Sequence, residues 1–322
     1  MSKAEPAVFT FPGMRNLSKE ERKSVTHSDF WIPEAEREVY KRALIALNEA
    51  GVPYVVAGAY AIYEHTNIIR QTKDLDLFCT PEAVLEAMRA LREAGFITRL
   101  EQSHWLAKAI SRDNRDHFVD IIYGMGNGLA LIDEDWYHHS TPAILAATQV
   151  RVAPPEELIW HRLFINERHR HDMADIAHLI LCVGHLMDWQ RLIDKTEEHW
   201  PLLLSQVLMF RYVYPGYRDQ VPQWVIRALL SRAEEAGREP PAEGEEHDLT
   251  RGTLISRFSF AIDVNEWGFH DLRREKVREM QAYPAVITLE EADVWDEMSD
   301  HATAASVPDA QEAVLSTQEA NK

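Results

Sequence analysis

Cysteine is scarce in this chain of 322 residues, which contains only Cys79 and Cys182. Two cysteines cannot build a disulfide framework or a four-thiolate zinc site. Long apolar runs are also missing, because the stretch from Ile176 to Gly184 is far shorter than the roughly 20 residues that cross a bilayer. The first residues, MSKAEPAVFTFPGM, lack the charged and apolar regions of a signal peptide. These absences predict a cytoplasmic, reduced protein with no membrane partner.

Basic residues are in deficit, since 34 lysines and arginines face 52 acids and leave a net charge of −18. The excess is uneven along the chain. Residues 234–248 carry a net charge of −6 and residues 285–322 a net charge of −8, which leaves −4 for the rest. Charge in such segments usually serves solvation. The overall charge therefore neither indicates nor excludes a nucleic-acid partner.

The first half of the chain alternates strand and helix patterns. Runs over 52–58, 73–79, 96–101 and 117–124 have strand character, and helical patterns lie between them. After residue 154 the pattern is helical, with residues 156–184 forming one long helix or two helices with a bend near 168–171. The sequence predicts a small mixed sheet in an α/β (α+β) domain followed by an α-helical domain. The predicted parts are an irregular segment 1–30, an α/β domain 31–153, a helical domain 154–236, an acidic linker 237–248, a helical extension 249–302 and a disordered tail 303–322.

Two acids two residues apart are the sharpest chemical feature. In a strand, Asp74 and Asp76 project from one face while Leu75 between them faces the other. Neighbouring carboxylates repel one another unless a cation lies between them, and Mg²⁺ prefers such oxygen ligands. Two solvated acids on an edge strand are the alternative for a bare pair of this kind.

The surroundings of the pair favour the metal interpretation. A strand that ends in Gly58 precedes it, and glycine lets backbone approach a phosphate closely. Downstream, Asp120 lies inside the apolar run HFVDIIY, where an acid is costly unless it is paired or bound to metal. Three acids on neighbouring strands therefore predict a metal site.

These motifs resemble the nucleotidyltransferase (polymerase-β-like) superfamily. Its pattern is a glycine followed by glycine or serine, then an acid–apolar–acid strand, then a third acid on a later strand. The likeness covers residues 36–185 and is nearest to the AbiEii-like toxin-type and uncharacterised bacterial nucleotidyltransferases. Ala59 departs from the pattern, although its backbone N–H remains. The matching segments are Val56–Ala59, Arg70–Leu77 and Val119–Ile121.

The resemblance implies transfer of a nucleoside monophosphate from an NTP to an acceptor. Asp74 and Asp76 would hold two Mg²⁺ ions, and Asp120 would bind one of them and activate the acceptor hydroxyl. Positive charge and a hydroxyl group would hold the triphosphate. The implied nucleotide-binding residues in this part of the chain are Gly58, Ala59, Arg70, Thr72 and Lys73.

The helical half carries a second part of the likeness. The toxin-type group tends to have a glutamate and, five residues later, a lysine, and here Glu157 is followed by Arg162. Asp172 and Asp175 share one helical face, so their repulsion calls for a basic or metal partner. We expect Arg162, Asp172 and Asp175 to face the α/β cleft and help bind the nucleotide. A helix with an ordinary ion-pair face is the alternative.

The acceptor stays open: an RNA 3′ end, a protein hydroxyl or a small molecule would each suit the chemistry. The toxin-type likeness also implies a cognate antitoxin as a partner. Two other functions remain, a non-catalytic NTP- or RNA-binding module of the same fold and a metal-dependent phosphohydrolase.

Two further motifs have no assigned role. The glycines of 124–128 indicate a turn, because no helix follows at the dinucleotide-binding spacing. Arg251–Arg257 and Asp271-x-Arg273 fit either a lid that contacts the acceptor or a C-terminal helix packed on the helical domain.

Overall fold

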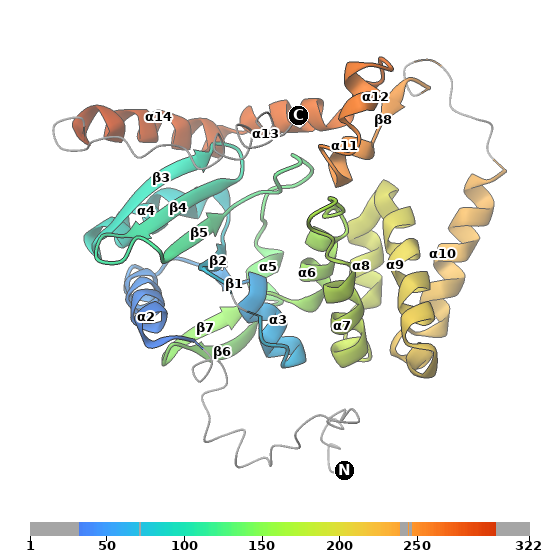
Figure 1. Cartoon of the computed structure of the whole chain (residues 1–322), viewed down its shortest axis with the longest axis horizontal. Helices are drawn as coiled ribbons and strands as arrows, with labels where there is room; N and C mark the ends of the chain where they lie inside the picture. The colour runs from blue at the N-terminus through green and yellow to red at the C-terminus, as the bar shows by residue number, and fades with distance from the viewer. Residues whose placement is uncertain (1–31, 71, 239–243, 245–246, 301–322) are drawn as a thin grey trace, which may run out of the picture.

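The computed structural model describes residues 32–70, 72–238, 244 and 247–300. The predicted irregular segment 1–30, most of the predicted linker 237–248 and the predicted tail 303–322 lie outside the described residues. Over the described part, a mixed sheet is followed by a helical region, which confirms the predicted fold class (Figure 1). No described helix combines the length and apolar character that crossing a bilayer requires.

The described strands form one seven-stranded sheet in the order β3-β4-β5-β2-β1-β7-β6, beside a separate two-stranded ladder. The central strand β2 runs parallel to β5 and antiparallel to β1, and β1 runs parallel to β7. The sheet is therefore mixed. Its strands are β1 (Val55–Val56), β2 (Asp74–Phe78), β3 (Phe96–Gln102), β4 (Leu106–Ser111), β5 (Phe118–Ile122), β6 (Thr141–Leu145) and β7 (Thr148–Val152).

Three of these strands were not predicted, namely β4, β6 and β7. The β6–β7 hairpin turns through Ala146 and Ala147, which both have positive φ values, 49° and 55°. Such a turn usually carries Asn-Gly or Asp-Gly, so the sequence lacks the usual hairpin signal. The predicted strand 52–58 is shorter than expected, because Gly58 already begins helix α3 (Gly58–Thr66).

One face of the sheet is covered by α2 (Glu34–Glu49) and α4 (Pro81–Glu93) (Figure 1). Pro81 at the first position of α4 suits the free N–H groups of a helix start. Leu75 and Leu77 of β2 point to this face and are fully buried. Each contributes about 1.5–3 kcal/mol by burial, which fixes the register of β2 and turns its acids to the opposite face.

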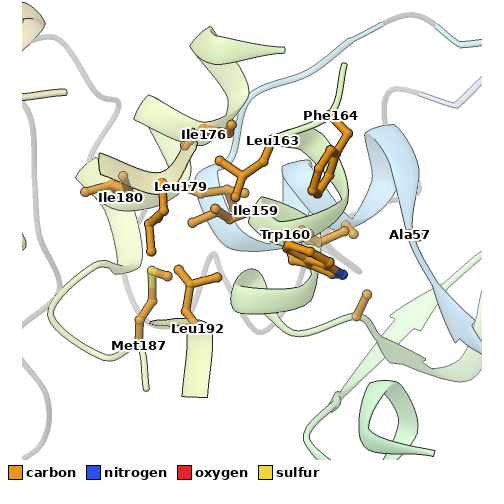
Figure 2. Close-up of a cluster of buried hydrophobic side chains, with 14 of the residues drawn as sticks. Ala57, Ile159, Trp160, Leu163, Phe164, Ile176, Leu179, Ile180, Met187 and Leu192 are labelled. Atoms are coloured by element: carbon orange, nitrogen blue, oxygen red, sulfur yellow. The ribbon is translucent and has the colours of Figure 1, made fainter. Parts of the chain in front are cut away.

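The helical region lies on the other side of the sheet (Figure 1). Its apolar core joins Ala57, at the end of β1, to Ile159, Leu179 and Leu192 on successive helices (Figure 2). The predicted helix 156–184 is two helices with a loop between them. The elements from α5 onward are α5 (Asp135–His138), α6 (Pro155–Arg162), α7 (Met173–Val183), α8 (Trp189–Thr196), η1 (Glu197–His199), α9 (Trp200–Val213), η2 (Pro215–Gln220) and α10 (Gln223–Ala236).

The C-terminal part runs from the helical region back to the sheet (Figure 1). It begins beside the helical region, and its last helix packs on α4 and β3. A two-stranded parallel ladder interrupts the helices, so the predicted helical extension 249–302 is mostly but not wholly helical. Its elements are β8 (Leu249–Thr250), α11 (Gly252–Ile255), α12 (Ala261–Asn265), β9 (His270–Asp271), α13 (Leu272–Gln281) and α14 (Pro284–Asp300).

Candidate active site

Three carboxylates converge on the face of the sheet that points away from α2 and α4. Asp74 and Asp76 lie on β2, and Asp120 lies directly opposite Asp76 in the parallel β2–β5 pair. One oxygen from each of the three side chains lies within 4.8 Å of the others. The period-two pattern of both strands thus brings together the three predicted acids, which we call the acidic triad.

Gly58 approaches the triad more closely than any other residue type allows. Its backbone amide follows Ala57, whose N–H donates to the carbonyl oxygen of Asp76 at 2.9 Å. A Cβ at residue 58 would lie 2.7 Å from Asp76 Cγ and nearer still to Oδ2. The φ angle of +56° also favours glycine. The predicted glycine is therefore required by both space and backbone conformation.

The triad is poorly balanced by the chain's own charges. Burial and, to a smaller extent, the charges of Asp74 and Asp120 together raise the pKa of Asp76 to about 7. Burial also raises the pKa of Asp120 to about 6, although Lys108 opposes this with an ion pair of 3.3 Å. Clustered, half-buried carboxylates of this kind fit a hard divalent cation such as Mg²⁺, which takes oxygen ligands.

The triad forms part of the wall of a cavity of about 570 Å³ between the sheet, α6–α7 and the C-terminal part. Gly58, Ala59, Arg70 and Thr72 line this cavity, as predicted for residues of a common site. Other lining residues are Phe78, Trp105, Ile122, Met125, Gly126, Asn127, His161, Arg162, Phe164, Ile165, Glu167, Arg170, Asp172, Asp175, Thr253, Leu254, Ile255, Arg257 and Arg273.

Thr72 and Lys73, both expected near the triphosphate, differ from each other in position: Thr72 lines the cavity and Lys73 does not. The Thr72 hydroxyl donates to Asp74 Oδ1, so this side chain orients a member of the triad. Lys73 is exposed and does not line the cavity. It immediately precedes Asp74, and neighbouring strand residues point to opposite faces. We therefore leave Lys73 out of the phosphate contacts.

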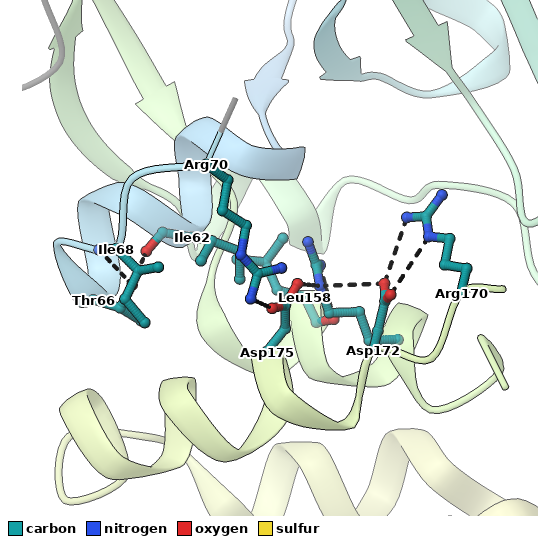
Figure 3. A network of polar contacts seen from close by, with 9 residues as sticks. Ile62, Thr66, Ile68, Arg70, Leu158, Arg170, Asp172 and Asp175 are labelled. Carbon is teal, nitrogen blue, oxygen red and sulfur yellow. Dashed lines mark hydrogen bonds and ion pairs between the residues drawn. The ribbon is translucent and has the colours of Figure 1, made fainter. Parts of the chain in front are cut away.

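Arg162, Asp172 and Asp175 all line the cavity, as expected. Arg162 is 7% exposed, and its Nε lies 3.3 Å from Asp175 Oδ2 and 3.8 Å from Asp172 Oδ2. Asp175 also pairs with Arg70, and Asp172 pairs with Arg170 at 3.4 Å (Figure 3). We call these three arginines and two aspartates the arginine–aspartate network. It joins the loop after α3 to α6 and α7.

Glu157 turns away from this network. Its carboxylate is fully buried and pairs with Arg191 of α8, which also binds Glu156 at 2.9 Å. Burial raises the pKa of Glu157 to about 7, against the opposing charge of Arg191. Glu157 and Arg162 lie on different faces of α6 because five residues correspond to about 140° of helix rotation.

Sequence reasoning missed several charged residues that line the cavity or contact the triad. Lys108 comes from β4, and its cross-strand pairing with Asp120 depends on that unpredicted strand. Glu167 and Arg170 lie on the α6–α7 loop, where their backbone groups bond to each other at 2.8 and 3.3 Å. Arg257 and Arg273 belong to motifs that were noted in the sequence but had no assigned position.

No protein-family model matches the chain, and no curated protein matches it. The lincomycin-bound lincosamide antibiotic adenylyltransferase LnuA is one similar solved structure (13% identity, 46% of this chain and 96% of that chain, TM-score 0.34). Another is the antibiotic-resistance factor ANT(2'')-Ia (16% identity, 64% and 98%, TM-score 0.37). A third is an antigenic nucleotidyltransferase-like protein from Paracoccidioides brasiliensis (14% identity, 54% and 93%, TM-score 0.33).

None of these three structures is named as a member of the AbiEii-like subgroup. With TM-scores of 0.33 to 0.37, the likenesses are too distant to assign an activity to this chain.

Proposed function

We propose that the chain is a Mg²⁺-dependent nucleotidyltransferase, which transfers a nucleoside monophosphate from an NTP to a hydroxyl group of an acceptor. The observation that carries this proposal is the acidic triad, whose three carboxylates meet beside Gly58 in one cavity with the arginines of the network. The acceptor class is left open here among RNA, protein and small molecules.

Asp74, Asp76 and Asp120 would hold two Mg²⁺ ions. When bound, the ions supply positive charge that offsets the carboxylates and the triphosphate and that stabilises the attacking and leaving oxygens. Thr72 fixes the orientation of Asp74 through its hydroxyl group. Leu75 and Leu77, buried on the opposite face, hold β2 in place so that its acids stay directed into the cavity.

The triphosphate fits the side of the cavity formed by α3 and the network. Gly58 and Ala59 begin α3, where free backbone N–H groups favour an anion. Arg70 and Arg170 are partly exposed and hold one aspartate each, so they can exchange that partner for phosphate oxygens. Arg162 is more enclosed and holds the two aspartates in position.

In the transfer step, the acceptor oxygen forms a bond to the α-phosphorus. The bond from that phosphorus to the bridging oxygen breaks, and pyrophosphate leaves with the electron pair. Asp120 accepts the proton of the acceptor hydroxyl at a carboxylate oxygen. The products are a nucleotidylated acceptor and pyrophosphate.

A labelling experiment tests this function. The chain is incubated with each α-labelled NTP, Mg²⁺ and cell extract, and labelled products and pyrophosphate are measured beside Asp76→Asn. We expect label on an acceptor in step with pyrophosphate release, and a loss of more than about 100-fold in the variant, which removes a metal ligand at constant volume. Labelled nucleotide released without any acceptor would instead indicate a phosphohydrolase, and intact NTP binding without release would indicate a binding module.

The toxin-type character, a cognate antitoxin and a cytoplasmic location are also part of the proposal. They derive from the sequence resemblance and from the composition of the chain. Induced expression in a bacterial host tests the first of them. We expect growth arrest with the natural chain and normal growth with Asp76→Asn, and equal growth would exclude toxicity through transfer.

A further inference from the structure

The cavity has a second side that the triphosphate does not use. Beyond Asp120, strand β5 leads through Ile122 into the glycine turn, which we define as residues 124–128. The C-terminal part closes the cavity opposite this turn, with Leu254, Arg257 and Arg273 among its lining residues. This side adjoins Asp120, the acid proposed to accept the proton of the acceptor.

The glycine turn is a docking surface for the C-terminal part. Gly128 has a φ of +81°, and a Cβ there would lie 2.8 Å from Val277 Cα of α13. Asn127 donates to the carbonyl oxygen of Leu254 at 3.0 Å, and Arg273 donates to that of Gly126 at 2.9 Å. The turn therefore fixes the position of Arg273 at the cavity.

A second contact fixes Arg257. The carboxylate of Glu167, on the α6–α7 loop, accepts hydrogen bonds from the Ser256 hydroxyl and from the Arg257 backbone N–H, both at 2.7 Å. Asn166 N–H donates to the carbonyl oxygen of Ile255 at 3.0 Å. The C-terminal part is thus tied to both walls of the cavity.

The charges on this side favour an anion. Glu167, Asp172 and Asp175 are engaged by the contacts already described, so outside the triad each lining carboxylate has a partner. Within the part of the chain that the structure describes, neither Arg257 nor Arg273 forms an ion pair with a carboxylate. Burial and the positive charge of Arg257 lower the pKa of Arg273, and Asp271 opposes them, so these two cations of the cavity wall repel each other. An anion between them would relieve that repulsion.

The remaining wall is apolar and partly aromatic. Trp105 is half-buried, and its indole lies 3.3 Å from the place that a Cβ on Gly126 would occupy. Met125 and Leu254 extend this wall. Flat aromatic side chains beside a cationic groove are the usual surface on which nucleotide bases stack.

We propose that the acceptor is a nucleotide unit, whose phosphate lies between Arg257 and Arg273 and whose base packs against the wall around Trp105. This inference rests on the proposed function, because it assigns the hydroxyl that Asp120 deprotonates to the sugar of that unit. The oxygen of this hydroxyl attacks the α-phosphorus, its proton passes to Asp120, and pyrophosphate leaves. Free nucleotides and the end of an RNA strand share this chemistry.

Calorimetry on the full chain, saturated with Mg²⁺ and a non-hydrolysable NTP analogue, tests the proposal. The probes are adenosine 5′-monophosphate, adenosine, a short single-stranded RNA that ends in adenosine, and a polycationic aminoglycoside. We expect the phosphate-bearing probes to bind at least about tenfold more tightly than adenosine, with the aminoglycoside weakest. Tighter binding of the RNA than of the monophosphate identifies a strand end as the source, and the reverse identifies a free nucleotide.

Variants locate the binding. Arg257→Gln with Arg273→Gln should remove the tenfold advantage of phosphate, and lysine at both positions should restore part of it. Arg274→Gln is the matched control, because Arg274 neighbours Arg273 but pairs with Asp271 at 3.4 Å outside the cavity. NTP-analogue binding should stay unchanged in all of them, which also shows that the variants fold.

Either of two binding results would overturn the inference: equal binding of adenosine with and without phosphate, or phosphate binding that the double variant leaves unchanged. Label transfer to an aminoglycoside at the natural rate in the double variant would also overturn it, while supporting the proposed function. Binding of the monophosphate that depends on both arginines, without any transfer of label, would support a nucleotide ligand at this site and would contradict the proposed function.

Discussion

Two groups of acids line the same cavity, and the chain balances them differently. Asp172 and Asp175, in the helical region, lie among three arginines that pair with them. The acidic triad lies on the sheet, and Lys108 is the one cation within ion-pair distance of it among the described residues. The helical acids are neutralised by the chain itself, whereas the triad is left with excess negative charge.

This difference in charge balance bears on which group of acids a metal ion would stabilise. Buried carboxylates that already hold arginines gain little from a metal, and their removal leaves arginines without partners. Carboxylates that repel one another gain from a divalent cation and lose little when one of them becomes an amide. The comparison is consistent with the proposed metal binding at the sheet and the proposed phosphate binding at the helical network, and each prediction below tests one side of it.

The largest effect is expected from Gly58→Ala, which acts directly on the triad. The added Cβ would overlap the Asp76 carboxylate, and alanine disfavours the φ of +56°. We expect transfer to fall by more than about 100-fold, because a displaced ligand disrupts the metal site. Initial rates with labelled NTP measure this, with circular dichroism to verify the fold. Ala59→Gly is the control and should keep its activity; a Gly58→Ala enzyme within threefold of the parent would remove Gly58 from the site.

The two groups should respond with opposite signs when one acid is made neutral. Without metal, Asp76→Asn should stabilise the fold by about 1–2 kcal/mol, since it removes a buried charge repelled by two others. Asp175→Asn should destabilise it by about 3 kcal/mol, since Arg162 is buried and loses a partner. Urea denaturation in the presence of a chelator measures both.

Mg²⁺ extends that test. It should raise the melting temperature of the natural chain and of Asp175→Asn, because ligand bound to the native state stabilises it. It should have little effect on Asp76→Asn. If both amides changed stability in the same direction, or if Mg²⁺ stabilised Asp76→Asn as strongly as the parent, the contrast between the two groups would be wrong.

A smaller effect distinguishes two arginines that pair with buried acids, Arg162 of α6 and Arg191 of α8. Arg162→Gln should raise the KM for NTP about tenfold. Arg162 positions Asp172 and Asp175, and these aspartates pair with Arg170 and Arg70, the arginines proposed to bind phosphate. Arg191→Gln should leave KM unchanged but lower stability by about 3 kcal/mol, because it strands the buried Glu157. Steady-state kinetics and denaturation of both variants check this. An unchanged KM in Arg162→Gln would leave the network as scaffold.

The triad was predictable because local patterns define it. Period-two alternation placed Asp74 and Asp76 on one face of β2, and the apolar setting of Asp120 identified the third acid. The same logic could not place Lys108, because its strand is rich in alanine and lacks a strand signal. Pairing of β4 with β5 is a tertiary effect that no local pattern encodes.

The other side of the cavity was less predictable because it is built from distant contacts. Arg273 reaches Gly126, which lies 147 residues earlier, and Glu167 holds Ser256 across 89 residues. The glycine turn and the Asp271-x-Arg273 motif were both visible in the sequence, but no local sequence pattern shows that they contact each other. Glu157 is a similar case, since its partner Arg191 comes from the next helix but one.

The smallest effect concerns Glu64 on α3, an acid for which no ion pair is found among the described residues. Burial raises its pKa from 4.5 to about 7, so the folded chain favours its protonated form. A raised folded pKa contributes stability that is full below about pH 4.5 and is lost as the pH rises through 7. Glu64→Gln, which cannot ionise, should therefore gain about 1 kcal/mol over the parent at pH 8.5, after allowance for its partial exposure. At pH 4, below the unfolded pKa of 4.5, the gain should nearly vanish. Urea denaturation at both pH values measures the difference in free energy of unfolding between Glu64→Gln and the parent. The titration of the triad contributes equally to both proteins and cancels in this difference. Glu93→Gln, at an exposed position, is the control. An equal gain in stability in this control, or a gain in Glu64→Gln that does not depend on pH, would contradict the prediction. Glu64 would then stay ionised by pairing with a cation, as the other acids do.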